Sequence, residues 1–327
     1  MTLPPVSLVI PVKDEEASVD ALLASIGAQT QAVDEVIFVD SASSDRTVAL
    51  LRNASLGTTP IRVIESGPGS PGKGRNIGIS AATNQWVALT DAGIKLDPRW
   101  VEELLEVVRR NPELDVVYGN YEPVVDTFFE RNAALVYVPA KQERAGEKMR
   151  GPSIASCLLR REVWQAVGGF PDLRAAEDLM FMEQVERHPF KIGWAPRATA
   201  WWQLRPSLLS TFRRFVLYSR HNVLAGRQKY WHYGIARQYI LALIVTLVAL
   251  VSGIWWLLLA LPLGMLLRVF KSIWSRRETL SGLGLINPLR WVHVLIITLA
   301  IDLATFVGWI QAYLPAAARA PIKSQAD

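Results

Sequence analysis

Asp91 is the residue whose position most directly suggests chemistry. It follows the apolar run Trp86–Leu89, which has the length of a strand, and it precedes an alanine and a glycine. A buried parallel strand delivers such a carboxylate to its carboxyl end, the edge where open α/β sheets bind ligands. There Asp91 could hold Mg²⁺ or Mn²⁺ against a diphosphate, because hard cations share oxygen ligands with phosphates. The alternative is that Asp91 only ends a strand or caps the helix expected at about 97–110.

Further acidic residues follow strand and turn patterns, and of these Asp178 could divide the chemistry with Asp91. Asp40 ends the apolar run 36–39, and Glu177 and Asp178 follow a Gly-Gly-Phe turn. A carboxylate that lies opposite a phosphate-binding one can take the proton from an attacking hydroxyl while a diphosphate departs. The alternative for Glu177 and Asp178 is a solvated acidic helix start.

The glycine-rich stretch 67–74 nearly matches the phosphate-binding pattern G-x-x-x-x-G-K-[ST]. Gly74 stands where the hydroxyl residue should be, and two prolines interrupt the loop, so a nucleoside-triphosphate hydrolase is a minor alternative. As a loop that leads into a helix, the segment instead offers Lys73, Arg75 and Asn76 to a base or a phosphate.

Strand and helix patterns alternate along the first 110 residues. Short apolar runs predict strands, and apolar residues at helical spacing between them predict helices. The predicted strands are 6–12, 36–39, 61–64 and 86–89, and the predicted helices begin near 13, 47 and 97. This alternation predicts an α/β fold, a parallel sheet with helices on its faces.

Several short motifs occur in an order and at spacings that resemble the family 2 glycosyltransferases of GT-A fold. They are Ile10–Glu16, Asp40-Ser41, Asp45–Thr47, Gly74–Asn76, Thr90-Asp91, Val167–Pro171 and Ala176–Leu179, and they cover about residues 4–200. The resemblance implies a Rossmann-like mixed sheet with flanking helices. It also implies transfer of a sugar from a nucleotide-diphosphate sugar, in a single displacement with inversion.

The resemblance further implies roles for individual residues. Asp178 would be the catalytic base, with Glu177 as its neighbour, and Asp91 would be the metal carboxylate. Asp40 would bind the nucleotide base, with Arg75 beside it. The other residues implied for nucleotide-sugar binding are Pro11, Val12, Glu15, Ser41, Lys73 and Asn76.

One departure from the family pattern concerns the metal. The family usually has Asp-x-Asp, whereas this chain has Asp91-Ala92-Gly93, and Asp97 lies too far along to replace the missing carboxylate. A single carboxylate and the diphosphate oxygens can still hold a cation that keeps several waters. The sequence therefore predicts Mg²⁺ or Mn²⁺ as a cofactor, with a weakened dependence on it.

Charge is distributed unevenly along the chain. Of the 30 acidic residues, 27 precede Arg187, and none lies between Glu186 and Glu278, a gap that holds 14 of the 35 basic residues. A basic, apolar region with many tryptophans favours an anionic membrane surface over nucleic acid as the partner. The single cysteine, Cys157, excludes an intrachain disulfide, and the N-terminus shows no signal-peptide pattern.

The segment 116–150 starts with a strand-like run and continues as a charged helical stretch. In related folds this region contacts the acceptor and should set specificity. Lys141, Arg144, Lys148 and Arg150 could face an anionic acceptor, or they could form the solvated face of a helix.

Residues 201–237 include apolar side chains at helical spacing opposite Arg213, Arg214 and Arg220. A basic amphipathic helix with flanking aromatics suits the membrane interface, and an ordinary helix packed on the catalytic domain is the equal alternative. The chain lacks the Gln-x-x-Arg-Trp motif that processive synthases resembling this family carry here, which favours transfer of one sugar per acceptor.

Residues 239–269 are almost wholly apolar and would form one helix about 46 Å long, more than a ~30 Å hydrocarbon core requires. Gly253 near the middle and basic residues on both flanks favour a hairpin with both ends in the cytoplasm over one tilted helix. We expect crossings at about 238–253, 254–270 and 291–314, with two crossings as the alternative. Asp302 should face protein rather than lipid.

Together these observations predict a cytoplasmic GT-A catalytic domain at 1–200, an interfacial region at 201–237 and a membrane anchor at 238–327. The predicted function is a membrane-anchored inverting glycosyltransferase of the cytoplasmic (inner) membrane. Its partners would be a nucleotide-diphosphate sugar and a lipid or lipid-linked glycan acceptor, with no nucleic acid. The alternative is a catalytically silent nucleotide-sugar-binding scaffold, motivated by the missing second metal carboxylate. The four histidines show no metal-binding spacing.

Overall fold

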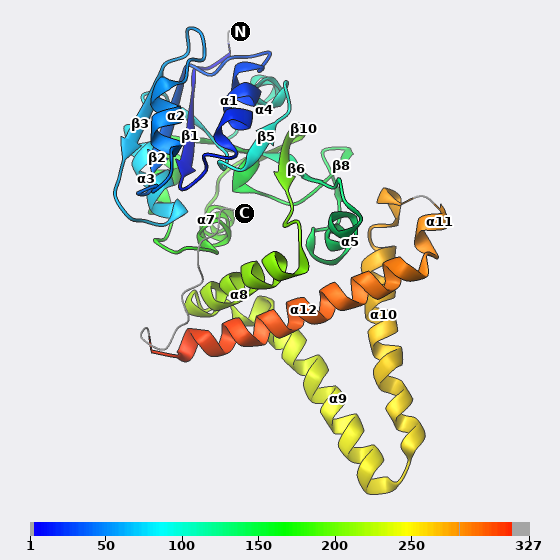
Figure 1. Cartoon of the computed structure of the whole chain (residues 1–327). Helices are drawn as coiled ribbons and strands as arrows, with labels where there is room; N and C mark the ends of the chain where they lie inside the picture. The colour runs from blue at the N-terminus through cyan, green and yellow to red at the C-terminus, as the bar shows by residue number, and fades with distance from the viewer. Residues whose placement is uncertain (1–2, 281, 316–327) are drawn as a thin grey trace. The chain divides into compact units, whose positions relative to one another are not determined.

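The computed structural model describes residues 3–280 and 282–315 (Figure 1). The N-terminal part is built on an eight-stranded mixed sheet with the order β3-β2-β1-β4-β9-β6-β10-β5. The first four of these strands are parallel neighbours, while β9 and β5 run antiparallel to the strands beside them. The strands are β1 Val6–Val12, β2 Glu35–Asp40, β3 Ile61–Glu65, β4 Trp86–Leu89, β5 Ile94–Leu96, β6 Val116–Val124, β9 Cys157–Arg160 and β10 Ile192–Gln203. The predicted α/β fold is confirmed.

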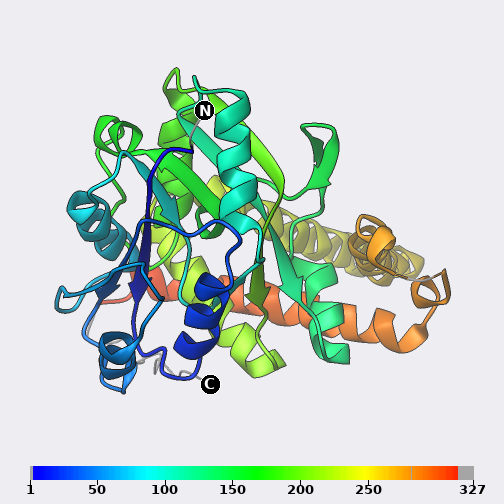
Figure 2. The ribbon, with the colours of Figure 1, turned by 90° about the horizontal axis from the view of Figure 1, so that it is seen from above.

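Helices cover both faces of this sheet (Figure 2). Successive side chains of a strand point to opposite faces, so Leu8 and Ile10 of β1 pack under α1 and α4, while Val9 packs under α3 and α7. Two apolar cores therefore hold the parallel strands between them. The helices are α1 Val19–Gly27, α2 Thr47–Asn53, α3 Pro71–Ala81, α4 Trp100–Arg110, α6 Arg161–Ala166 and α7 Glu177–Arg187.

The charged stretch at 141–150 is not helical, which corrects the expectation for this segment. β7 (Gln142–Arg144) and β8 (Glu147–Met149) form a hairpin. Its two loop residues, Ala145 and Gly146, have φ of 50° and 78°. Positive φ at both positions is the geometry of the tight turns that join antiparallel strands, so the chain reverses here instead of coiling. The helix of this region is α5 (Phe128–Tyr137), which a Thr127–Glu130 capping box starts.

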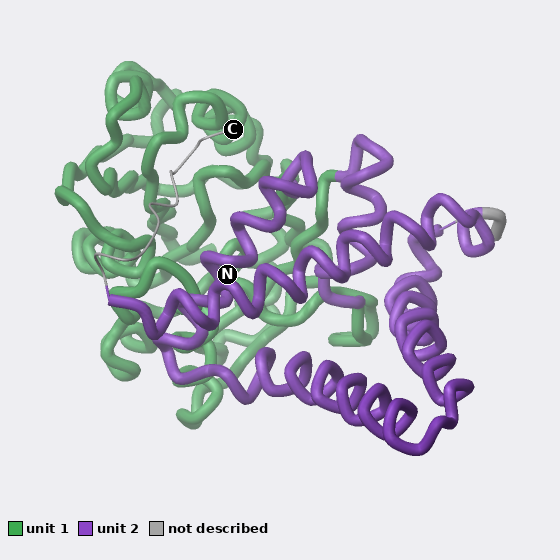
Figure 3. The backbone as a smooth tube through the Cα atoms, turned by 60° about the horizontal axis from the view of Figure 1, so that its bottom comes forward, with its two compact units in different colours: residues 1–124, 141–203, 324–327 green, residues 125–140, 204–323 purple. Residues whose placement is uncertain are grey.

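The chain divides into two compact units (Figure 3). Among the described residues, unit 1 comprises 3–124 and 141–203, and unit 2 comprises 125–140 and 204–315. The break after residue 203 lies close to the predicted domain boundary at residue 200. Residues 125–140, which the prediction placed in the catalytic domain, instead group with the C-terminal helices.

Unit 2 is entirely helical in its described part and contains the apolar helices. Gly253, with φ of 71°, ends α9, and a 3₁₀ turn at Trp255–Leu259 leads into α10, so the chain makes a hairpin rather than one long helix. The segments His232–Ser252, Trp255–Trp274 and Pro288–Tyr313 are each long and apolar enough to cross a membrane. The helices are α5, α8 Leu208–Leu224, α9 His232–Ser252, α10 Ala260–Trp274, α11 Gly282–Leu285 and α12 Pro288–Tyr313.

The last apolar helix, α12, lies beside α8 and passes across the open end of the α9–α10 hairpin (Figure 1). At their crossing, a Cβ on Gly308 would lie 2.4 Å from the Val216 carbonyl oxygen and 2.6 Å from Ser219 Cβ, so the contact requires glycine. Asp302 is 1% exposed and faces protein, as the sequence predicted. The basic helix α8 is therefore at least in part a packed helix, with Val216 and Ser219 buried against α12.

Candidate active site

The strand ends of unit 1 bring the predicted nucleotide-binding residues to one edge of the sheet. Val12 pairs with Asp40 across β1 and β2, and Val9 pairs with Leu89 across β1 and β4. Asp91, two residues beyond Leu89, is therefore level with Pro11. In this parallel half of the sheet the strand order reverses at β1, the place where α/β folds open a ligand crevice.

Arg75 connects the two sides of this edge. Its Nη2 donates to Asp91 Oδ1 at 2.5 Å, and its Nη1 donates to Glu177 Oε1 at 2.9 Å. The side chains of Arg75 and Glu177 are 4% and 7% exposed, whereas that of Asp91 is 42% exposed. Arg75 was expected beside Asp40, and the ion pairs that it forms in the structure are with Asp91 and Glu177.

The charges of this cluster perturb one another. Burial raises the pKa of Asp178, the charge of Arg75 opposes that rise, and the charge of Asp91 adds to it. The pKa of Glu177 is also raised, mainly by burial. Burial alone would lower the pKa of Arg75, but Asp91, Glu177 and Asp178 together raise it above its ordinary value. A buried, permanently charged guanidinium thus stands among three carboxylates.

Close packing of α3 positions Arg75. Ser70 caps the helix by accepting the Lys73 N–H, and Pro71 begins it. A Cβ on Gly72 would lie 2.4 Å from the Pro171 carbonyl oxygen, and one on Gly78 would lie 2.3 Å from Val9 Cγ1. The glycines therefore let α3 approach both β1 and the loop before α7. Because that loop covers the start of α3, the helix lacks the open N-terminus that a phosphate-binding P-loop needs.

Asp178 lies in the first turn of α7, where the helix dipole favours negative charge. Ala176, the residue before the acidic pair, has φ of 71°, a left-handed conformation that is costly for alanine. The half-buried Asp178 carboxylate accepts a hydrogen bond from the Leu179 N–H at 2.8 Å. Glu177, by contrast, is held by Arg75 and is suited to positioning.

Six other predicted residues have hydrogen-bond partners in the described part of the chain. Asn76 accepts from Trp164 Nε1 and the Phe170 N–H and donates to the Phe170 carbonyl, so it fastens the loop before α7. Lys73 Nζ donates to the Pro68 carbonyl. The carboxylates of Asp40 and Glu15 accept from the hydroxyls of Ser43 and Ser18 respectively. Val12 accepts the Ser41 N–H, which joins the first two strand ends. Their roles in binding nucleotide stay predictions.

Two residues near the cluster were missed by the sequence reasoning. The Phe170 ring stacks on Phe181 at 3.9 Å and lies 5.4 Å from the Arg75 guanidinium. Burial raises the pKa of Tyr121, a residue of β6, to about 12. The charge of Asp178 adds to this rise, so the two side chains are close. Phe170 was visible in the Gly-Gly-Phe motif, but Tyr121 gave no signal beyond its place in a strand.

The donor atoms around Asp91 decide which kind of metal site is feasible. The described residues contain no group of three or more His, Cys, Asp or Glu side chains that could hold a metal ion. Asp91 offers one half-exposed carboxylate, and its Oδ1 already accepts from Arg75. This donor set fits a cation that takes its remaining ligands from phosphates and water, rather than a site made by protein alone.

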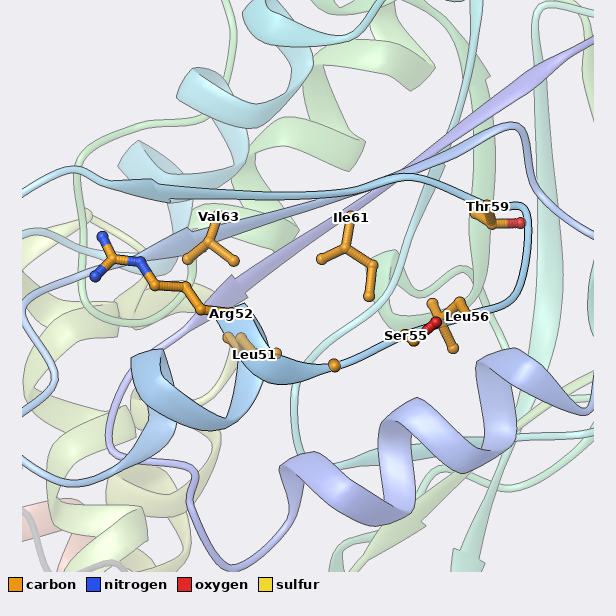
Figure 4. A pocket seen from close by; sticks show the side chains of 8 residues that line it. Leu51, Arg52, Ser55, Leu56, Thr59, Ile61 and Val63 are labelled. Atoms are coloured by element: carbon orange, nitrogen blue, oxygen red, sulfur yellow. The ribbon is translucent and has the colours of Figure 1, made fainter.

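A surface pocket of about 280 Å³ lies elsewhere in unit 1, between the end of α2 and the edge strand β3 (Figure 4). Leu51, Leu56, Ile61 and Val63 line it together with Arg52. None of the predicted site residues lines this pocket.

The motifs that the strand ends and α3 bring together belong to a segment that matches a known family. Residues 7–168 match the family model described as glycosyl transferase family 2. The chain is a family 2 glycosyltransferase. A curated relative, an uncharacterized glycosyltransferase of Haemophilus influenzae, is 27% identical over 250 residues, which are 72% of this chain and 83% of the relative.

Two further comparisons extend this family 2 assignment. The undecaprenyl-phosphate 4-deoxy-4-formamido-L-arabinose transferase of Aeromonas hydrophila is 29% identical over 160 residues, which are 47% of this glycosyltransferase and 48% of the relative. The crystal structure of S. aureus TarS 1-349 in complex with UDP-GlcNAc aligns with a TM-score of 0.51 at 15% identity, over 94% of this chain and 90% of that one. The likeness shows the fold, which confirms the GT-A prediction.

Proposed function

We propose that this glycosyltransferase transfers a sugar from a nucleotide-diphosphate sugar to a hydroxyl or phosphate oxygen of a lipid or lipid-linked acceptor, with inversion. In the proposed step the acceptor oxygen forms a bond to the anomeric carbon while the bond from that carbon to the diphosphate breaks. Asp178 takes the proton of an acceptor hydroxyl, and the nucleoside diphosphate leaves with the electron pair of the broken bond. The atoms and charges balance without a further reactant.

The observation that carries this proposal is the double ion pair of Arg75. The guanidinium joins Asp91, at the end of β4, to Glu177, the neighbour of Asp178. It thereby sets the distance between the carboxylate on the phosphate side and the carboxylate on the acceptor side. Fixed charges in a site with little water stabilise developing charge more strongly than the same charges in solution.

A divalent cation would be held by Asp91 and the diphosphate. When bound, Mg²⁺ or Mn²⁺ would neutralise negative charge on the leaving phosphates. Arg75 shares the Asp91 carboxylate, so the protein supplies a positive charge at this place in any case. This arrangement supports a weaker metal requirement than a site with two carboxylates would have.

The lipid acceptor is supported by the apolar helices of unit 2 and by the Aeromonas relative, whose name includes undecaprenyl phosphate. A membrane anchor concentrates an enzyme where a lipid substrate is found. Basic residues flank the α9–α10 hairpin on both sides, which supports an orientation with the catalytic unit in the cytoplasm at the inner membrane.

The test uses the detergent-solubilised chain and a panel of nucleotide sugars, with transfer measured to a lipid-linked acceptor that offers a hydroxyl. Asp178→Asn should lower transfer by at least about 10²-fold, because general-base catalysis contributes that much, while thermal stabilisation by the donor persists. Asp20→Asn, at an exposed position of α1, is the control. If Asp178→Asn transfers sugar at the normal rate, Asp178 is not the base.

A second readout separates catalysis from binding. Any nucleotide sugar that stabilises the wild type should stabilise Asp91→Ala less, since that variant loses a carboxylate on the phosphate side. If no nucleotide sugar stabilises the wild type, with or without Mn²⁺, the donor pocket is not as proposed.

A further inference from the structure

Unit 2 contains a cavity of about 260 Å³ at the open end of the α9–α10 hairpin. Three aromatic residues form one side, with the Phe215 ring 5.1 Å from Tyr137 and 5.9 Å from Trp231. Arg268 and Ser272 of α10 line another side. Whole small-molecule ligands usually occupy about 300–1,000 Å³, so this cavity suits a polar head with a few carbons attached.

The charged group in the cavity wall is held in place by an uncommon arrangement. Arg268 donates through Nη1 and Nη2 to both oxygens of Asp302, at 2.5 and 2.6 Å, and Tyr239 donates to the same carboxylate at 2.9 Å. Asp302 is 1% exposed, whereas the Arg268 side chain is 24% exposed. The guanidinium has five N–H donors, of which two are directed to Asp302. Asp302 thus fixes an arginine that still has access to the cavity.

Ionisable residues are rare among apolar helices and usually mark a function. If the Arg268–Asp302 pair were fully enclosed, holding α10 to α12 would be a sufficient reason for it. Here the pair borders a cavity, and the sequence supplies no acidic residue between Glu186 and Glu278 that would repel an anion from α8, α9 or α10. The carboxylate of Asp302 faces Arg268 and Tyr239.

The position of the cavity along the hairpin indicates its depth in a membrane. Residues 240–253 and 254–267 form the two apolar arms beyond it, fourteen residues each, and most of their large side chains are exposed. At 1.5 Å per residue each arm reaches about 21 Å, less than the ~30 Å hydrocarbon core. With the hairpin tip at the far boundary of the core, the cavity lies within about 10 Å of the near boundary between hydrocarbon and headgroups. Basic residues at the same end of the hairpin agree with that level: Arg227, Lys229, Arg237, Lys271, Arg276 and Arg277.

We propose that this cavity binds the phosphate of a lipid phosphate, with Arg268 and Ser272 as its donors and the aromatic side against the first carbons of the chain. The rest of the hydrocarbon chain extends along the exposed arms of the hairpin. This inference rests on the proposed lipid acceptor and specifies that the acceptor carries a phosphate next to its hydrocarbon chain. A guanidinium with N–H donors beyond the two that Asp302 accepts matches phosphate better than a neutral headgroup.

The test measures binding by native mass spectrometry on the full-length chain, with geranylgeranyl phosphate, geranylgeraniol and inorganic phosphate as separate probes. One molecule of the lipid phosphate should bind, roughly ten- to a hundredfold more tightly than the alcohol, since hydrogen bonds to a charged group contribute that difference. Inorganic phosphate alone should not bind. Equal affinity for the alcohol and the phosphate would overturn the proposal, and binding of inorganic phosphate would assign the site to a free anion.

Two variants place the ligand in the cavity. The double variant Arg268→Gln with Asp302→Asn removes the pair without leaving a buried charge, and it should lose the preference for phosphate over alcohol. Ser272→Leu fills the cavity and should weaken binding, whereas Ser275→Leu makes the same change outside the lining. Unchanged binding by Ser272→Leu would overturn the assignment even if the double variant failed to fold.

Donor binding keeps this test separate from that of the proposed function. The cavity variants should keep their stabilisation by nucleotide sugar, because all lining residues belong to unit 2. A wild type that binds lipid phosphate but no nucleotide sugar would contradict the proposed function and leave the cavity assignment standing. A wild type that binds nucleotide sugar but no lipid phosphate would overturn the cavity assignment and leave the proposed function standing.

Discussion

At the residue scale, Arg75 combines a structural and an electrostatic role. A single buried guanidinium pairs with two carboxylates that come from opposite sides of the site, and burying Glu177 without this counter-ion would cost more. Asp178, which depends on Arg75 only through its charge, keeps a carboxylate that can accept a proton. The three carboxylates therefore differ in role because they differ in burial and hydrogen bonding.

Arg75→Gln should lower the free energy of unfolding by about 3–5 kcal/mol, because it leaves the Glu177 carboxylate buried without a counter-ion. Arg46→Gln is the matched control, since the Arg46 side chain is 79% exposed and pairs with Glu16 at the surface. The control should change stability by less than about 1 kcal/mol. Chemical denaturation of the detergent-solubilised protein, followed by tryptophan fluorescence, measures both. An equal loss of stability in the two variants would mean that the buried Arg75–Glu177 pair stabilises the protein no more than a surface pair does.

The raised pKa of Asp178 predicts the acid side of the pH profile. A general base acts when deprotonated, so a raised pKa means that activity is lost at a higher pH than for an ordinary aspartate, above about 4. Arg75 lowers the Asp178 pKa, so Arg75→Gln should move the acid limb of kcat/KM to still higher pH. The pH dependence of sugar transfer measures this, and a shift to lower pH would contradict the electrostatic account.

At the element scale, the packing of α3 decides where Arg75 lies. Gly72 and Gly78 lie within the helix, against Pro171 and Val9 respectively, so they are not turn residues. Each removes a side chain where the backbone of α3 meets another segment. Arg75 and Asn76, on the same helix, then reach Glu177 and the Phe170 backbone from that fixed distance.

Gly72→Ala should therefore destabilise the protein by about 1–3 kcal/mol and reduce sugar transfer, because the new Cβ would displace the Pro171 carbonyl and the start of α7. On helix propensity alone the same change would stabilise by up to about 1 kcal/mol, so the sign is diagnostic. Gly151→Ala, with no atom within 4 Å of the added Cβ, is the control. If Gly72→Ala is as stable and active as the control, close approach of α3 is not required.

At the scale of the whole molecule, the chain combines a GT-A unit with a helical unit whose hairpin is apolar on nearly all sides. The described arms of α9 and α10 are mostly exposed, and their apolar surface suits a hydrocarbon environment. In α12 the exposed side is apolar, whereas the buried side carries Thr298, Asp302 and Thr305. One face of α12 thus suits lipid, and the other is completed by protein.

The hairpin predicts that its two ends lie on the same side of the membrane. In a Cys157→Ala background, Lys229→Cys and Arg277→Cys should both react with a membrane-impermeant maleimide from the cytoplasmic side, in inverted vesicles. The same reagent should not label Val251→Cys from that side, because Val251 lies at the hairpin tip. Labelling of residues 229 and 277 from opposite sides would contradict the hairpin topology.

The order of motifs was enough to predict the parallel strands, the strand-end carboxylates and the family, because the patterns that specify strands, turns and acidic positions are local. The break at Gly253 and the burial of Asp302 were also predicted, since a glycine inside an apolar run and a charge in a span each allow few arrangements. The hairpin at 142–149 was missed because a charged stretch can be strand or helix until its turn geometry is known.

The amino-acid sequence by itself determined that this chain is a family 2 glycosyltransferase with an apolar helical region, because those properties follow from local patterns and their order. Only the tertiary structure decided what Arg75 does. Its partner Glu177 lies 102 residues further along the chain, and their contact depends on how closely α3 approaches the loop before α7. The cavity of unit 2 likewise exists only after five separate segments pack, because no single segment encloses it. Long-range contacts of this kind depend on the packing of whole elements, which no local pattern specifies.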